Sequence, residues 1–261
     1  MRDDRFSGDS GNTLWTLSAL EAAQDAGQLP PWAADAYSGF KATVLDPGFP
    51  CTFGIVAQEK GMLRYAFAPS ARAEADRLHI RAAITEYLEH LKGLSRTDAA
   101  MALLVLFLHA DGIAPSLESH QQEAWDLLQY LHDSDPAPWR SDIPTDPDHP
   151  LWSFCFAGSA LFVNISSPAH QMRLSRNLGS ALTLIIQPRE GFDVVAPDTS
   201  KGRRTRAMIR QRLAEFDQVP PYPELGFYQD PRNREWKQYG IPDDDQPGPA
   251  RCPLHVRKPQ T

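Results

Sequence analysis

A nearly continuous aliphatic run at residues 101–109 constrains the fold of this chain more than any other segment. The run reads MALLVLFLH, and its length and composition are typical of a β-strand. Strands that are apolar at almost every position are covered on both faces. We therefore expect a central strand that is buried on both sides of its sheet.

Residues 152–189 add a second constraint, because two apolar runs there flank a polar segment. Residues 154–165 and 181–186 are rich in β-branched and aromatic side chains, and they are predicted to be buried strands. Residues 166–179 then connect the two strands. Such a connection is where a rigid scaffold presents side chains to a ligand.

Three basic side chains occur at intervals of three in this connection: His170, Arg173 and Arg176. We predict a turn at Ser167-Pro168 that leads into a short helix with all three side chains on one face. One imidazole and two guanidinium groups on one face suit an anionic or metal-containing ligand better than a packed core.

The remaining pattern predicts an α+β fold: one mixed-sheet domain with flanking helices and a proline-rich C-terminal tail from Pro220. The expected helices are residues 13–27, 31–45, 70–91 and 117–133. A β-hairpin is expected from residues 52–57 and 63–68. We assign residues 1–48 to an N-terminal helical segment that packs with the main domain, residues 49–261.

Composition excludes several classes of protein. A net charge of −7 argues against a dedicated nucleic-acid binder. The apolar run at residues 99–110 is too short to span a bilayer, and the first residues do not form a signal-peptide core. We therefore expect a cytoplasmic protein that does not bind membranes. Its three widely spaced cysteines predict free thiols.

A second cationic segment, residues 201–213, reads as an amphipathic helix. Its cations could bind phosphate or a propionate, or they could form an ordinary solvated face. The common enzyme signatures, including the dinucleotide-binding, P-loop, nucleophile-elbow and zinc-protease motifs, do not occur. The sequence therefore gives no support to most standard enzyme classes.

Six blocks together resemble the YqcI/YcgG family, and they span residues 49–253. They are Phe49-Pro50-Cys51-x-Phe53-Gly54, Trp152-x-Phe154-x-Phe156-Ala157-Gly158, Pro168-Ala169-His170-x-x-Arg173-x-Ser175-Arg176-Asn177, Gln187-Pro188-Arg189, Glu235-Trp236-Lys237-Gln238-Tyr239 and Cys252-Pro253. The resemblance implies a haem-dependent N-oxygenase of a natural-product pathway, which hydroxylates a guanidine nitrogen of arginine or an arginine-like compound.

A b-type haem (haem b) needs an axial ligand, an apolar slot and donors for its propionates. His170 is the first candidate for the axial ligand and the iron. Cys51 is the alternative, since a thiolate favours oxygen-bond cleavage. Arg173, Arg176 and Arg189 are the candidates for the propionates, and Arg189 could instead pair with the carboxylate of the substrate.

A guanidinium substrate needs a carboxylate, and Glu118, Glu123 and Glu235 are the candidates among many surface acids. Because the chain carries no flavin or nicotinamide fingerprint, an external electron donor, a reductase partner or peroxide is implied. Two alternatives stay open: a haem-binding or sensing module without turnover, and an N-oxygenase of a non-guanidine amine. A homodimer is compatible with either.

Overall fold

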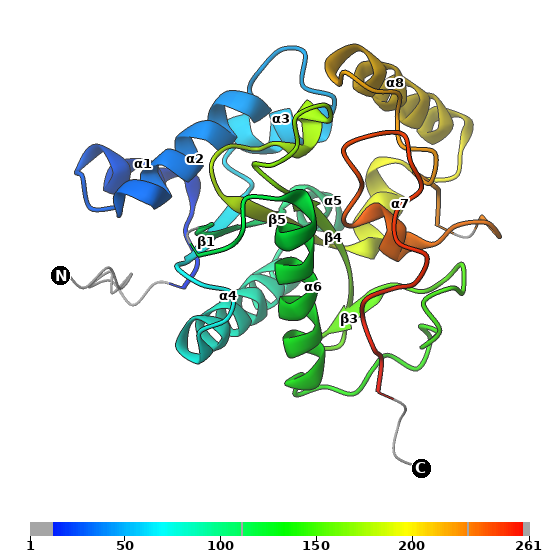
Figure 1. Ribbon diagram of the computed structural model, residues 1–261, viewed down its shortest axis with the longest axis horizontal. Helices are drawn as coiled ribbons and strands as arrows, with labels where there is room; N and C mark the ends of the chain where they lie inside the picture. Colours follow the sequence, from blue (N-terminus) through cyan, green and yellow to red (C-terminus); the bar gives the residue numbers. More distant parts are fainter. Residues whose placement is uncertain (1–12, 111, 229, 258–261) are drawn as a thin grey trace.

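The computed structural model describes residues 13–110, 112–228 and 230–257. These residues form one five-stranded sheet in the order β1-β2-β5-β4-β3, at the centre of the molecule in Figure 1. β1 and β2 pair in parallel, and the other neighbours pair antiparallel. The strands are β1 (Arg64–Ala68), β2 (Leu104–Leu108), β3 (Phe154–Phe156), β4 (Ser159–Ser166) and β5 (Leu182–Pro188).

Helices surround this sheet and connect its strands. The α-helices are α1 (Leu17–Asp25), α2 (Pro31–Val44), α3 (Thr52–Glu59), α4 (Glu74–Lys92), α5 (Arg96–Met101), α6 (Leu117–Asp133), α7 (Phe192–Val195) and α8 (Ser200–Phe216). The 3₁₀ helices are η1 (Leu174–Arg176), η2 (Arg189–Gly191) and η3 (Glu235–Gln238). A mixed sheet with flanking helices confirms the predicted α+β class. Within the described part of the tail after α8, η3 is the one regular element.

Strand β2 carries a hydrophobic core on each face of the sheet. All five of its residues are buried, and they alternate between the two cores. Leu104, Leu106 and Leu108 belong to one core, whereas Val105 and Phe107 belong to the other. The structure thus confirms a strand buried on both faces. It is shorter than the predicted residues 101–109, because Met101 still belongs to α5.

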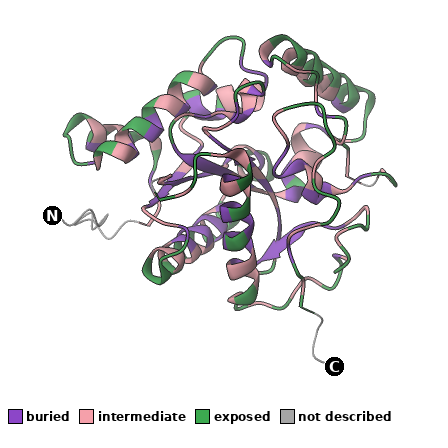
Figure 2. Ribbon diagram, viewed as in Figure 1, coloured by how far each residue is buried: buried purple, intermediate pink, exposed green. Residues whose placement is uncertain are grey.

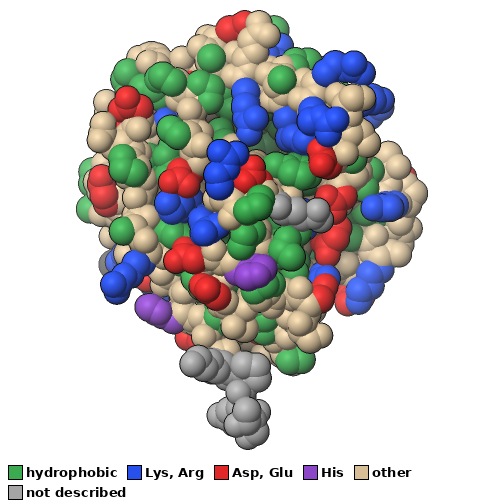
Figure 3. All heavy atoms as spheres, turned by 90° about the vertical axis from the view of Figure 1, so that its right-hand side faces the viewer, with side chains coloured by type: hydrophobic (Ala, Val, Ile, Leu, Met, Phe, Trp, Pro, Cys, Tyr) green, Lys and Arg blue, Asp and Glu red, His purple; other side chains and the backbone are tan. Residues whose placement is uncertain are grey.

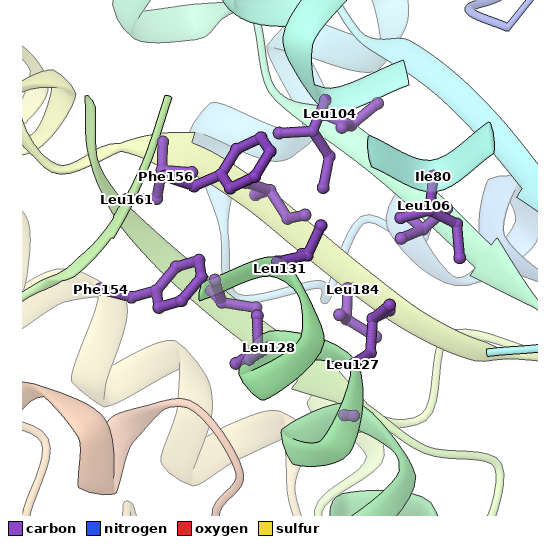
Figure 4. Packing of buried hydrophobic residues seen from close by; sticks show 14 of the residues in the cluster. Ile80, Leu104, Leu106, Leu127, Leu128, Leu131, Phe154, Phe156, Leu161 and Leu184 are labelled. Carbon is purple, nitrogen blue, oxygen red and sulfur yellow. The ribbon is translucent and has the colours of Figure 1, made fainter. Parts of the chain in front are cut away.

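Helices α4 and α6 cover one face of the sheet, and α1 to α3 cover part of the other (Figure 1). Figure 4 shows leucines of α6 pointing toward side chains of β2, β3, β4 and β5. On the opposite face, Phe40 of α2 meets Phe107 edge to face, with ring centroids 5.6 Å apart. Figure 2 shows the resulting buried layers along the strands, while the outer surfaces of the helices stay exposed.

One face of strand β4 extends beyond the part of the sheet that α1 to α3 cover. Its Leu161, Val163 and Ile165 belong to the α4–α6 core, and Phe162 and Asn164 alternate with them on the opposite face. Phe162 still contacts that core through Tyr239, whose ring centroid lies 5.2 Å from its own. On the opposite face, the core beneath α1 to α3 is built on β1 and β2 and includes neither Phe162 nor Asn164 among its buried members. The surface of β4 beyond that core is where the cavity described below is located.

Side-chain caps fix the ends of several helices. Ser116 accepts the Ser119 N–H at the start of α6, and Thr199 accepts the Gly202 N–H at the start of α8. Helix α6 therefore has the bounds predicted for residues 117–133. The helices predicted at residues 13–27, 31–45 and 70–91 are also confirmed, as α1, α2 and α4 with adjusted ends.

The predicted hairpin of residues 52–57 and 63–68 is wrong. The first segment is helix α3, and the second is β1, which pairs in parallel with β2. A short apolar run does not distinguish a buried helix from a strand by periodicity. Here the Cys51 side chain accepts the Gly54 N–H and caps a helical start, which the β-branched composition conceals.

The predicted single strand at residues 154–165 is instead the hairpin β3–β4. Its two-residue turn is Ala157-Gly158, whose φ angles of 49° and 74° are both positive. Two positive φ values match the twist of a tight antiparallel hairpin. Hairpin turns of this type usually carry Asn-Gly, and alanine rarely adopts a positive φ. The sequence Ala-Gly therefore did not indicate a turn at this position.

Among the helices of the described residues, none combines the length and apolar character needed to cross a bilayer.

We expect Leu106→Ala to lower the free energy of unfolding by about 3 kcal/mol, because it opens a cavity in a fully buried core. Leu78→Ala is the matched control, since Leu78 is 44% exposed on α4 and its loss should cost less than about 0.5 kcal/mol. Denaturant unfolding followed by circular dichroism measures both values. Equal losses in the two variants would contradict the assigned core.

Candidate functional site

A cavity with two adjoining chambers lies against the face of β4 that carries Phe162 and Asn164. The larger chamber has a volume of about 300 Å³ and the smaller about 170 Å³. The larger volume lies at the lower limit of the range of small-molecule sites. The residues that border both chambers are Cys51, Asn164, Arg176, Ile209, Leu213 and Leu225.

The larger chamber has aromatic walls and a basic rim. Figure 3 shows Lys and Arg side chains gathered on the upper part of this face, beside a recess lined by hydrophobic side chains. Arg206 and Arg210 reach the chamber from α8, and Arg189 reaches it from η2. The aromatic lining comes from separate segments: Phe53, Phe162, Phe192, Phe227 and Tyr228.

Cys51 borders both chambers from the N-terminal end of α3. Its Sγ lies 3.3 Å from the Gly54 N, so a backbone N–H points at the sulfur. Burial raises the pKa of this thiol, while hydrogen bonds from the Gly54 and Phe53 amides lower it. A metal ion deprotonates a coordinating thiol. Amides at a helix N-terminus favour the thiolate that such a metal would bind.

Glu235 lines the larger chamber at the start of η3 and is 3% exposed. Its Oε1 accepts hydrogen bonds from the Ser153 hydroxyl at 2.6 Å and the Tyr239 hydroxyl at 2.8 Å. Burial raises the pKa of this carboxyl to about 7, against the lowering effects of both hydroxyls and of Arg189. Within the described residues no hydrogen bond reaches Oε2, which is therefore the carboxyl oxygen available to a ligand.

Arg189 follows the last residue of β5 and is 6% exposed. Its guanidinium carbon lies 3.7 Å from the centroid of the Tyr228 ring, and it forms an ion pair with Asp193. That ion pair is the only side-chain hydrogen bond of Arg189 in the described part of the chain. The remaining N–H groups are available to an anion in the chamber.

His170 is buried but does not line either chamber. Its Nδ1 lies 3.3 Å from the Ser167 carbonyl oxygen, and its Nε2 lies 3.2 Å from that of Ile241. Burial lowers the pKa of this imidazole. The ring thus lies between two backbone segments, away from the cavity that Cys51 borders.

Arg173 and Arg176 border the cavity, but each donates several hydrogen bonds to acceptors of the protein. Burial lowers the pKa of both, to about 10 for Arg176. Their acceptors are the backbone oxygens of Pro242, Pro220 and Asp244 for Arg173, and Asn164 Oδ1 with the backbone oxygens of Tyr239 and Gln238 for Arg176.

The predicted helix that would place His170, Arg173 and Arg176 on one face is wrong. The connection forms only the three-residue helix η1, which begins at Leu174 and leaves His170 and Arg173 outside. Arg173 donates to the tail at Pro242 and Asp244, and Arg176 donates to it at Gln238 and Tyr239. Both hold the tail against the connection.

Two of the three predicted substrate carboxylates lie away from the cavity. Glu118 is exposed in the first turn of α6, and Glu123 is buried in a salt bridge with Arg72. Helix α6 covers the other face of the sheet. Only Glu235 among these candidates reaches the larger chamber.

The residues at the cavity meet the three requirements of haem. Cys51 offers a thiol that would bind iron as a thiolate, the aromatic lining offers an apolar slot, and Arg189, Arg206 and Arg210 offer cations for propionates. No group of three or more His, Cys, Asp or Glu residues suited to a metal ion occurs in the residues that the structure describes. Haem iron does not need such a group, because the porphyrin supplies four of its ligands.

The sequence profile of the YqcI/YcgG family matches residues 40–255, and the chain belongs to this family. This confirms the resemblance drawn from the six sequence blocks. A Streptomyces lavendulae protein named "Putative N(omega)-hydroxy-L-arginine synthase DcsA" is 38% identical over 255 residues, which cover 95% of this chain and 92% of that protein.

Two further relatives come from Bacillus subtilis (strain 168). YcgG is 35% identical over 252 residues, covering 95% of this chain and 96% of that protein. YqcI is 33% identical over 250 residues, covering 94% of this chain and 95% of that protein. Both are named uncharacterized proteins. No solved structure matches the chain.

The raised pKa of Glu235 predicts a pH-dependent stability. Between the ordinary carboxyl pKa of 4.5 and about 7, the folded protein holds a proton that the unfolded chain has lost. The contribution of Glu235 to the free energy of unfolding therefore falls as pH rises through this window, by about 3 kcal/mol in total. Glu235→Gln should remove this component, so that variant gains stability relative to the wild type as pH rises from about 5 to about 8.

Denaturant unfolding at several pH values measures this difference, with Glu118→Gln as the control for loss of an exposed carboxylate. A constant difference in unfolding free energy between Glu235→Gln and the wild type across the window would mean that Glu235 is already ionised in the folded state.

Proposed function

We propose that this protein is a haem-dependent oxygenase that hydroxylates a guanidine nitrogen of arginine or an arginine-like compound. The observation that carries the proposal is the convergence of Cys51 and Glu235 on one aromatic cavity. A thiol and an available carboxylate are the groups that haem iron and a guanidinium each need. Similarity over nearly the whole chain to a protein named as an arginine-hydroxylating enzyme supports the same reaction.

The cavity residues have separate tasks toward the cofactor. Cys51 would hold the iron as a thiolate, with the Gly54 N–H stabilising the charge on sulfur. Phe53 and Phe162 would contact the apolar part of the ring, and arginines at the rim would bind its propionates. When bound, the haem supplies activation of O₂ and delivery of one oxygen atom to the substrate nitrogen.

Glu235 would hold the guanidinium of the substrate through Oε2. The hydroxyls of Ser153 and Tyr239 fix Oε1, so the free oxygen keeps one orientation in the chamber. A carboxylate–guanidinium contact in this buried setting is strong and directional. It would place one guanidine nitrogen at a fixed position relative to Cys51 and shield it from bulk water.

The reaction needs electrons from outside the chain. Conversion of an N–H to an N–OH with O₂ consumes two electrons and two protons and releases one water molecule. We propose an external one-electron donor, because the sequence carries no flavin or nicotinamide fingerprint.

We expect Cys51→Ala to abolish the absorption spectrum of a thiolate-ligated ferrous–carbon monoxide haem, whereas His170→Asn keeps it, because the cavity reaches Cys51 and not His170. Cys252→Ser is the matched control for loss of another half-buried thiol. The spectra are recorded after expression with added haem precursor. A thiolate spectrum in Cys51→Ala, or its loss in folded His170→Asn, would overturn this ligand assignment.

We expect Glu235→Gln to weaken arginine binding about 100-fold, because an amide cannot provide the negative charge that a guanidinium needs. In the wild type, affinity should rise about tenfold per pH unit up to about pH 7 and then level off, since the neutral carboxyl must lose its proton on binding. Glu118→Gln should bind as the wild type does.

Calorimetry in two buffers with different ionisation enthalpies measures both the affinity and the proton release. Mass spectrometry then tests for hydroxyarginine after incubation with reductant and O₂. Haem-loaded protein that binds arginine but leaves it unchanged under these conditions would favour a sensing module over an oxygenase. Protein that binds neither haem nor arginine would overturn the proposed function.

A further inference from the structure

Helix α8 has an exposed outer face that the catalytic proposal does not use. Of its 17 residues, only Gly202 is buried. Two adjacent rows of exposed residues run along it at intervals of three and four, which places each row on one side of the helix. The rows are Lys201, Arg204, Met208, Gln211 and Glu215, and Arg203, Ala207 and Ala214. Arg210 continues the second row but lines the cavity.

Arginines at the other side of α8 hold the helix to the rest of the protein. Arg206 donates to the Ala196 and Pro197 carbonyl oxygens, and Arg212 donates to those of Pro47 and Phe49. Hydrogen bonds to backbone oxygens thus help to hold α8 in place, whereas α4 and α6 are held by burial of their apolar residues. Arg212 is structural, and Arg206 both holds the helix and lines the cavity, so neither explains the cations of the outer face.

The cations at the start of α8 oppose the helix dipole. Lys201, Arg203 and Arg204 lie near the N-terminal end, where the dipole disfavours positive charge, and the first turn carries no acidic residue. Arg203 pairs with Asp198 at 2.9 Å. Lys201 and Arg204 have no ion pair within the described residues. In a chain of net charge −7, helix stability therefore does not account for this positive surface (Figure 3).

The same helix forms a wall of the proposed haem cavity. Ile209 and Leu213 of α8 border both chambers, beside Cys51. A helix is about 10 Å in diameter, so a protein on the outer face would be separated from the cavity by one helix. Met208, 43% exposed, lies one turn from Arg204 and gives this cationic row an apolar centre.

We propose that the outer face of α8 docks an acidic one-electron carrier protein, of the flavodoxin or ferredoxin class. The inference rests on the proposed function, which requires an outside donor. Charge complementarity would steer the encounter, and contact around Met208 would complete a small, transient interface. Such an interface is typical of electron-transfer partners, because the carrier must dissociate after it delivers each electron.

The test measures binding of a purified acidic flavodoxin to the haem-loaded protein by calorimetry at low and at physiological ionic strength. We expect binding that weakens with salt, because exposed charges are screened. Lys201→Glu/Arg204→Glu should weaken binding at least about tenfold. Lys92→Glu/Arg96→Glu, at exposed positions around the end of α4 and the start of α5, is the control with the same change in net charge and should bind as the wild type does.

Equal affinity of the two double variants, or no flavodoxin binding by the wild type, would overturn the docking proposal. Binding of the wild type to phosphatidylserine vesicles but not to flavodoxin would assign the face to lipid and would overturn it as well. Arginine binding and turnover with a chemical reductant, measured on the α8 variant, test the proposed function separately, because neither needs the carrier protein.

Discussion

The buried guanidinium of Arg176 is the contact on which the candidate site depends. It donates to Asn164 on β4 and to the backbone oxygens of Gln238 and Tyr239 at the end of η3. One side chain thereby joins the sheet, the connection before β5 and the segment that carries Glu235. A buried cation is costly unless its donors are satisfied, so these acceptors fix the three segments relative to one another.

The site also contains a carboxyl group whose burial lowers the stability of the fold. Glu235 is almost fully buried, and its raised pKa means that the charged form costs stability near neutral pH. Ser153 and Tyr239 satisfy only one of its oxygens. A bound cation would stabilise the charged form of this carboxyl. The burial that makes this carboxylate destabilising in the free protein would also strengthen its contact with the proposed guanidinium substrate.

Sequence periodicity determined the parts of the fold that are set locally. Helix α6 was predicted with its observed bounds from apolar residues at helical spacing, and the structure adds a serine cap at its start. The buried strand β2 was predicted from its aliphatic run. Helix α3 and the β3–β4 turn were missed, since a cysteine cap and an alanine with positive φ are uncommon local signals. The sequence blocks also predicted the family correctly.

The tertiary structure decided which candidates meet at one place. From spacing alone, His170, Arg173 and Arg176 formed a group, and Cys51 and Glu235 were isolated residues. Folding places His170 away from the cavity and engages Arg173 and Arg176 with protein acceptors, whereas it brings Cys51 and Glu235, 184 positions apart, to one cavity. The reason is physical, because residue types determine only which chemistry is available. A buried arginine must bond to nearby acceptors, and side chains alternate between the faces of β4. These two constraints determine which side chains remain available to a ligand.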